Sequence, residues 1–235
     1  MVLPSSLTGR VVLYFHGSVD THRGLAATVA SAAQARALLI DYRLAPEHPF
    51  PAAVLDAQAA YAWLLDQGIV PEQVALAGDS AGGGLLLALM VSLRGGGQPL
   101  PAAGVCLSPW ADLTLSGRSW TTNARRDLLL SAVILRQMGQ LYLGDADPLT
   151  PLASPMYADL AGLPPLLIQV GGDEALLSDA EEVALRAEAA GVEVELEVWS
   201  GMFHVWHLTS RVIPEARHAV ERIGAFLQAR FAEAA

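Results

Sequence analysis

Short apolar runs separated by longer alanine- and leucine-rich segments form the main pattern along the chain. A continuous run of four to eight apolar residues is typical of a buried strand, whereas the longer segments suit helices. The short runs predict strands at residues 11–15, 37–41, 73–78, 102–107, 166–170 and 192–199. The longer segments predict helices at residues 21–35, 51–66, 81–93, 131–142, 178–190 and 214–231.

The order of these elements predicts the fold class. Strands that alternate with helices favour a parallel sheet, because each helix carries the chain back to the same end of the sheet. We therefore expect an α/β protein with a mostly parallel central sheet and helices on both faces. Residues 108–165 break the alternation, since they contain many Pro and Asp residues and one clear helix. We expect one domain over residues 1–235, with residues 108–165 as an excursion from the sheet.

Composition excludes several partners and chemistries. The net charge is −10 and no basic cluster is present, which argues against nucleic acid or an anionic membrane surface as partner. All 14 basic residues are arginine, so chemistry that needs a lysine is excluded. The single cysteine, Cys106, excludes an internal disulfide and a cysteine zinc cluster. No apolar stretch is long enough to span a membrane and no signal peptide is evident, so we expect a cytoplasmic protein.

One pentapeptide matches a motif with known chemistry, because G-x-S-x-G occurs at Gly78-Asp79-Ser80-Ala81-Gly82. It lies between a predicted strand and a predicted helix, the context in which this motif exposes its serine on a strained turn. We expect Ser80 to act as a nucleophile, with the Ala81 amide facing a developing oxyanion. The alternative is an ordinary glycine-rich turn. A dinucleotide site is disfavoured because G-x-G-x-x-G is absent.

A nucleophilic serine needs a histidine base, and the histidine follows the acid in the chain order of this fold. Three histidines follow the last predicted strands: His204, His207 and His218. His204 lies in a glycine-led turn shortly after residues 192–199, whereas His218 lies inside a predicted helix. His204 and His207 also form an H-x-x-H pair, but a third metal ligand is not nearby in sequence. We therefore expect His204 to be the base and expect no metal.

The carboxylate that orients the histidine should follow the predicted strand at residues 166–170. Asp173 and Glu174 are adjacent there, and both have the required chemistry. A third carboxylate, Asp179, suits the first turn of a helix, where the helix dipole stabilises a negative charge. Residue type and spacing do not separate Asp173 from Glu174.

Further motifs make the chain resemble the bacterial hormone-sensitive-lipase-like esterases, which are family IV carboxylesterases of the α/β-hydrolase superfamily. The resemblance runs nearly from end to end of the sequence. The motifs that carry it are Y-F-H-G at residues 14–17, D-Y-R-L-A-P-E at 41–47, G-D-S-A-G-G-G at 78–84, S-P-W-A-D at 108–112, G-G-D-E at 171–174 and M-F-H at 202–204.

The resemblance implies hydrolysis of short-chain acyl esters by a serine triad, through an acyl-enzyme and without a cofactor. It implies Glu174 as the triad acid, with Asp173 as the second choice. It also implies that residues 108–165 border the active site and that the strand at residues 192–199 serves homodimer formation. An amidase or a lactonase would use the same triad, because the leaving group is chosen by the shape of the pocket.

Two departures from the family affect these expectations. Family members carry a His-Gly-Gly-Gly run where this chain has His16-Gly17-Ser18, so the loop that supplies oxyanion donors is shorter here. Gly17 and Ser18 are expected to donate with Ala81, but losing one donor costs roughly 10²–10³ in rate. A catalytically impaired ligand-binding relative is therefore an alternative. The N-terminal cap and first strands of the family are also expected to be absent, since the chain starts close to His16.

Overall fold

The structure, a computed structural model, describes residues 9–16 and 19–233. A six-stranded sheet lies at its centre, in the order β2-β1-β3-β4-β5-β6, and every neighbouring pair of strands is parallel. The parallel sheet predicted from the alternation of elements is thus confirmed. The strands are β1 (Val11–Phe15), β2 (Arg36–Leu39), β3 (Val74–Asp79), β4 (Ala103–Leu107), β5 (Leu166–Gly171) and β6 (Val194–Trp199).

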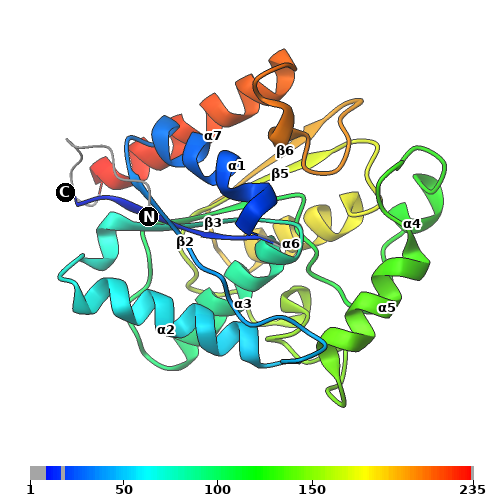
Figure 1. The fold of residues 1–235 in the computed structure, drawn as a ribbon, viewed down its shortest axis with the longest axis horizontal. Coiled ribbons are helices and arrows are strands. Elements are labelled where there is room, and N and C mark those ends of the chain that lie inside the picture. The colour runs from blue at the N-terminus through cyan, green and yellow to red at the C-terminus, as the bar shows by residue number, and fades with distance from the viewer. Residues whose placement is uncertain (1–8, 17–18, 234–235) are drawn as a thin grey trace.

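Helices cover both faces of the sheet, as predicted. Helices α1 and α7 pack against one face, while α2, α3 and α6 pack against the other (Figure 1). The α-helices are α1 (Val19–Ala32), α2 (Ala52–Asp66), α3 (Ala81–Gly95), α4 (Ser119–Thr122), α5 (Ala132–Leu143), α6 (Leu177–Ala189) and α7 (Pro214–Glu233). Three short 3-10 helices are η1 (Pro71–Gln73), η2 (Pro155–Tyr157) and η3 (Trp206–Thr209).

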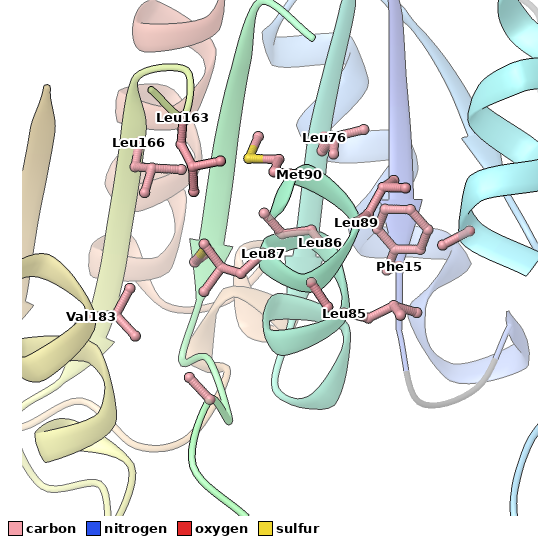
Figure 2. Packing of buried hydrophobic residues seen from close by; sticks show 14 of the residues in the cluster. Phe15, Leu76, Leu85, Leu86, Leu87, Leu89, Met90, Leu163, Leu166 and Val183 are labelled. Carbon is pink, nitrogen blue, oxygen red and sulfur yellow. The ribbon is translucent and has the colours of Figure 1, made fainter. Parts of the chain in front are cut away.

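The core explains why the strands read as unbroken apolar runs. Alternate side chains of β1 point to opposite faces of the sheet, and both faces are covered by helices, so all five residues are buried. In Figure 2 the leucines of α3 and Met90 lie among Phe15, Leu76 and Leu166 of the strands. This packing fixes α3, and with it the turn that precedes α3, against the middle of the sheet.

Glycines at the start of α3 allow the helix to lie unusually close to its neighbours. A Cβ at Gly82 would collide with the backbone of Phe15 and His16, and a Cβ at Gly84 would collide with the carbonyl of Trp110. The helix therefore forms despite its low-propensity glycines, because close packing replaces the stability that propensity would supply.

Several predicted boundaries are wrong by one to three residues, and two of these errors have a clear physical reason. The strand expected at residues 192–199 begins at Val194, because Val192 instead donates its amide to Ala187 at the end of α6. The helix expected at residues 21–35 spans Val19–Ala32 and ends before Gln34, which has a positive φ of 53°. An alanine-rich segment without a capping residue gives little indication of where its helix stops.

The excursion at residues 108–165 leaves the sheet at the carboxyl end of β4 and returns at β5. It contains α4, α5 and η2, and in Figure 1 α4 and α5 lie at one side of the sheet. Ligands of open parallel sheets bind beyond the carboxyl ends of the strands, so this segment is well placed to form part of a site. Within the described ranges, no helix combines the length and the apolar character needed to cross a membrane.

Candidate active site

Ser80 lies at the sharp turn between β3 and α3. Its φ is 53° and its ψ is −121°, a conformation that costs an L-residue about 1–3 kcal/mol. Neighbouring backbone offsets this cost, since the Ser80 amide donates to Leu107 at 2.9 Å and its carbonyl accepts from Trp110 at 2.9 Å. The carbonyl also accepts from the Gly83 amide at 3.0 Å. The serine is thus held by the next strand and by its own helix.

His204 lies opposite Ser80, on the turn that follows β6. Its Nε2 is 3.0 Å from the Ser80 Oγ, although 124 residues separate the two in the chain. Two backbone hydrogen bonds of Met202 fix this turn. The Met202 amide donates to the Trp199 carbonyl at 3.2 Å, and the Met202 carbonyl accepts from the Asp173 amide at 3.3 Å. The imidazole is therefore within hydrogen-bond distance of the only hydroxyl that the G-x-S-x-G motif presents.

Glu174 reaches the other ring nitrogen of the histidine. Its Oε2 lies 2.9 Å from His204 Nδ1, and the residue is completely buried. Asp173 points elsewhere, since its carboxylate is about one-third exposed and lies 3.6 Å from Arg126. A carboxylate that accepts from Nδ1–H leaves Nε2 free to accept the proton of Ser80. The structure thus brings Glu174, and not Asp173, to the histidine.

The oxyanion donors expected from the sequence fall into two groups. Ala81 is the first residue of α3, and the first amides of a helix have no acceptor inside the helix. Its N–H therefore remains available at the positive end of the helix dipole, next to Ser80. The other two expected donors, Gly17 and Ser18, lie outside the described residues.

A cavity of about 240 Å³ opens beside Ser80, with Ala81 in its wall. One wall residue, Tyr42, is held by a hydrogen bond from its hydroxyl to the His16 carbonyl. Burial raises the pKa of Tyr42, so this hydroxyl stays protonated at neutral pH. The excursion supplies much of the apolar remainder of the wall, namely Trp110, Leu113, Met138, Leu141, Tyr142, Leu152 and Ala153.

Comparison with known proteins shows the family of the chain. The family described as alpha/beta hydrolase fold matches residues 12–208. The acetyl-hydrolase of Streptomyces hygroscopicus is 52% identical over 233 residues, which cover 97% of this chain and 78% of that protein. The crystal structure of an esterase from the bacterial hormone-sensitive lipase family has a TM-score of 0.95 at 52% identity, covering 97% of this chain and 79% of that one. The chain belongs to this hormone-sensitive lipase family.

A more distant relative agrees on the chemistry. An esterase of Acinetobacter venetianus is 39% identical over 214 residues, covering 91% of this chain and 71% of that protein. The chain is therefore a carboxylic ester hydrolase with an α/β-hydrolase fold, as the motifs predicted.

The structure adds Ser108 to the site residues that the sequence predicted. Ser108, directly after β4, donates its Oγ–H to Glu174 Oε1 at 2.7 Å and accepts from the Val205 amide at 3.2 Å. It thus ties the acid to the residue that follows His204. Its position after a parallel strand, at the edge where Ser80 and Glu174 also lie, is the sequence signal that would have indicated this role.

Proposed function

We propose that this protein hydrolyses short-chain acyl esters through an acyl-enzyme formed on Ser80. The observation that supports this most strongly is the chain of contacts from Ser80 Oγ to His204 Nε2 at 3.0 Å and from His204 Nδ1 to Glu174 at 2.9 Å. A serine hydroxyl is a weak nucleophile unless an adjacent base takes its proton, and this arrangement supplies both the base and its orienting carboxylate.

The proposed reaction has two steps. His204 takes the Ser80 proton as Oγ attacks the ester carbonyl, and the Ala81 amide, with Gly17 and Ser18, stabilises the oxyanion. The tetrahedral intermediate collapses as the imidazolium of His204 protonates the leaving alcohol. A water molecule, deprotonated by His204, then attacks the acyl-enzyme and releases the acid and free Ser80. Glu174 holds His204 in the tautomer with a proton on Nδ1 throughout the cycle.

The size of the cavity supports a preference for short acyl chains. Pockets for drug-sized ligands have volumes of about 300–1,000 Å³, whereas the cavity beside Ser80 has about 240 Å³. Its wall is mainly aliphatic and aromatic, with Leu85 and Trp110 among the buried members. We propose that the acyl group enters this cavity and that long chains do not fit within it.

The homodimer and the cytoplasmic location expected from the sequence are two further proposals. Strand β6 ends the sheet formed by the described residues, so its outer edge has the geometry needed to pair with a second copy of the chain. We propose a homodimer through residues 192–199, which sedimentation of the wild type beside Leu196→Pro would test. A cytoplasmic location is likewise a prediction, to be tested by fractionating cells that express the full-length protein.

Steady-state hydrolysis of p-nitrophenyl acetate, butyrate and octanoate tests the proposed function, with Ser80→Ala as the matched control. We expect rates that fall from butyrate to octanoate and vanish in the variant. Circular dichroism of both proteins establishes that the fold is retained. Equal, near-background rates in the two folded proteins would contradict an active enzyme and favour a ligand-binding role.

A further inference from the structure

A second histidine lies three residues after the proposed base, where it is fully buried. His207 belongs to η3, and its Nε2 is 2.9 Å from Oε1 of Gln169 on β5. It has no step in the reaction proposed above, because its Nε2 bonds to Gln169 and not to Ser80 or Glu174. A buried imidazole tends to be kept for the hydrogen bond that it makes, since burying a polar group without a partner is costly.

The direction of this hydrogen bond follows from the other contacts of Gln169. The amide nitrogen of Gln169 donates to Glu197 Oε2 at 2.8 Å and to the carbonyl of Ala219 at 3.2 Å. Both protons of the amide are thus used, and Oε1 remains as an acceptor. His207 must therefore donate from Nε2–H, which leaves Nδ1 without a proton.

Glu197 is itself fixed from two sides. Its Oε2 accepts from the Trp199 indole N–H at 3.2 Å, and its Oε1 accepts from Arg222 Nε of α7 at 2.7 Å. Glu197 cannot turn without breaking these bonds, so Gln169 and then His207 are held in one orientation. The chain of hydrogen bonds runs from the surface of α7, through β6 and β5, to the turn that carries His204.

The turn between the two histidines is strained and anchored at both ends. Val205 has φ 49° and ψ 44°, a left-handed conformation that is unfavourable for a β-branched residue. Its amide is held by Ser108 on one side, and η3 is held by His207 on the other. Release of either anchor would let the Val205 backbone relax, and the His204 ring would move with it.

We propose that His207 is a positioning residue, which acts through its hydrogen bond to Gln169 to keep His204 directed at Ser80. This inference rests on the proposed role of His204 as the base. Burial, and to a smaller extent the proximity of His204, lowers the pKa of His207 to about 3. His207 thus remains neutral while His204 becomes an imidazolium, so it positions the base without repelling the charge that forms on it.

Two substitutions at this position separate the hydrogen bond from simple packing. Glutamine has an N–H donor at a reach similar to Nε2, whereas methionine fills a similar length without a donor. We expect His207→Met to lower kcat for p-nitrophenyl butyrate by about 10–100-fold with little change in KM, because small misplacement of a catalytic group has effects of this size. His207→Gln should restore kcat to within about fivefold of the wild type. Arg217→Met, on the exposed face of α7, is the control and should leave kcat unchanged.

The pH profile gives a readout that loss of packing alone would not change. In His207→Met we expect the limb of kcat/KM that reports His204 to move relative to the wild type, and in His207→Gln we expect it to stay in place. A wild-type kcat and pH profile in a folded His207→Met protein would overturn the proposal. An equal loss of kcat in the two His207 variants would overturn it as well.

NMR of the wild-type protein tests the same inference without a substitution and without turnover. Nitrogen shifts of the His207 ring should show a proton on Nε2 and none on Nδ1 from pH 5 to 8. A proton on Nδ1, or titration of His207 within that range, would contradict the positioning role. Because this measurement does not depend on ester hydrolysis, it distinguishes failure of the inference from failure of the proposed function.

Discussion

Glu174 Oε2 lies 2.9 Å from His204 Nδ1, while the carboxylate of its sequence neighbour Asp173 faces Arg126 at 3.6 Å. The difference arises where β5 ends, because the Gly171 amide donates to Glu174 Oε1 at 2.6 Å and turns that side chain inward. Glu174 is completely buried, whereas the Asp173 carboxylate is partly exposed to solvent. Two adjacent acids of similar chemistry are thus separated by the turn alone.

This separation predicts opposite outcomes for two neighbouring substitutions. We expect Glu174→Gln to lower kcat by about 10²–10⁴-fold, since the wrong histidine tautomer leaves Ser80 without a base. Asp173→Asn should leave kcat within about twofold of the wild type, because its contact with Arg126 is an exposed ion pair. Steady-state hydrolysis of p-nitrophenyl butyrate by both variants is the measurement. A larger loss in Asp173→Asn than in Glu174→Gln would contradict the assignment of the acid.

The sequence predicted the fold well where burial determines the pattern. The run at residues 11–15 matches β1 at both ends, because a strand covered on both faces is apolar at every position. The strand expected at residues 192–199 was two residues too long, since Val192 is buried under α6 and not in the sheet. An apolar residue fits a strand and a buried position under a helix equally well, so the pattern alone does not show where the strand begins.

The sequence predicted the candidate site only in part. Spacing and order led to Ser80 and His204, which the structure places 3.0 Å apart. Residue type and spacing left Asp173 and Glu174 open, and only the resemblance to the family implied Glu174, because the turn after β5 that separates the two side chains is not visible in the pattern. The role of Gln169 was missed, although a glutamine inside an otherwise apolar buried strand is a signal in itself, because buried polar side chains need partners.

The close approach of α3 to β1 predicts a sharp contrast between two glycines of the same helix. We expect Gly82→Ala to destabilise the protein by about 3 kcal/mol or more, because its Cβ would meet backbone that has no room to shift. Gly95→Ala, at the other end of α3, meets no atom within 4 Å and should change the stability by less than about 1 kcal/mol. Urea unfolding of both variants measures the difference. Equal stabilities would mean that α3 does not lie against β1 as described.

The assignment of the cavity to the acyl group predicts a change in chain-length preference. Met138 lines the cavity and is about half exposed, so Met138→Trp should narrow the cavity without unfolding the protein. We expect the rate for p-nitrophenyl butyrate to fall about 10-fold relative to acetate, in line with the effect of a methylene or two in an apolar pocket. Val133→Trp, exposed on the same helix but outside the cavity, is the control. An unchanged ratio of the two rates in Met138→Trp would place the acyl group elsewhere.

Asp179 predicts a pH dependence of stability. Burial and, to a smaller extent, the nearby charge of Asp112 raise its pKa to about 8, although two backbone amides donate to it. Between pH 4 and pH 8 the folded state keeps a proton that the unfolded state has lost. This carboxyl therefore makes the protein less stable as the pH rises, by up to about 1 kcal/mol per pH unit.

Asp179→Asn removes this titration while keeping an oxygen that accepts from Ala111 and Asp112. We expect the free energy of unfolding of the variant, relative to the wild type, to increase from pH 5 to pH 8. His207 affects the pH dependence of the stability in the opposite direction, because its lowered pKa makes the folded state less stable as the pH falls from 6.5 to about 3. The comparison of variant with wild type cancels that contribution. Parallel stability curves for the two proteins would show that Asp179 is ionised in the folded state.

Trapping the covalent intermediate is the most direct test of acyl transfer to Ser80. The protein is mixed with p-nitrophenyl butyrate, quenched in acid before one turnover is complete, and analysed by mass spectrometry of the intact chain and of its peptides. We expect one butyryl group per chain, on the peptide that contains Ser80, and no such group in Ser80→Ala. Steady turnover of the ester without acylation, or acylation at another residue, would contradict it.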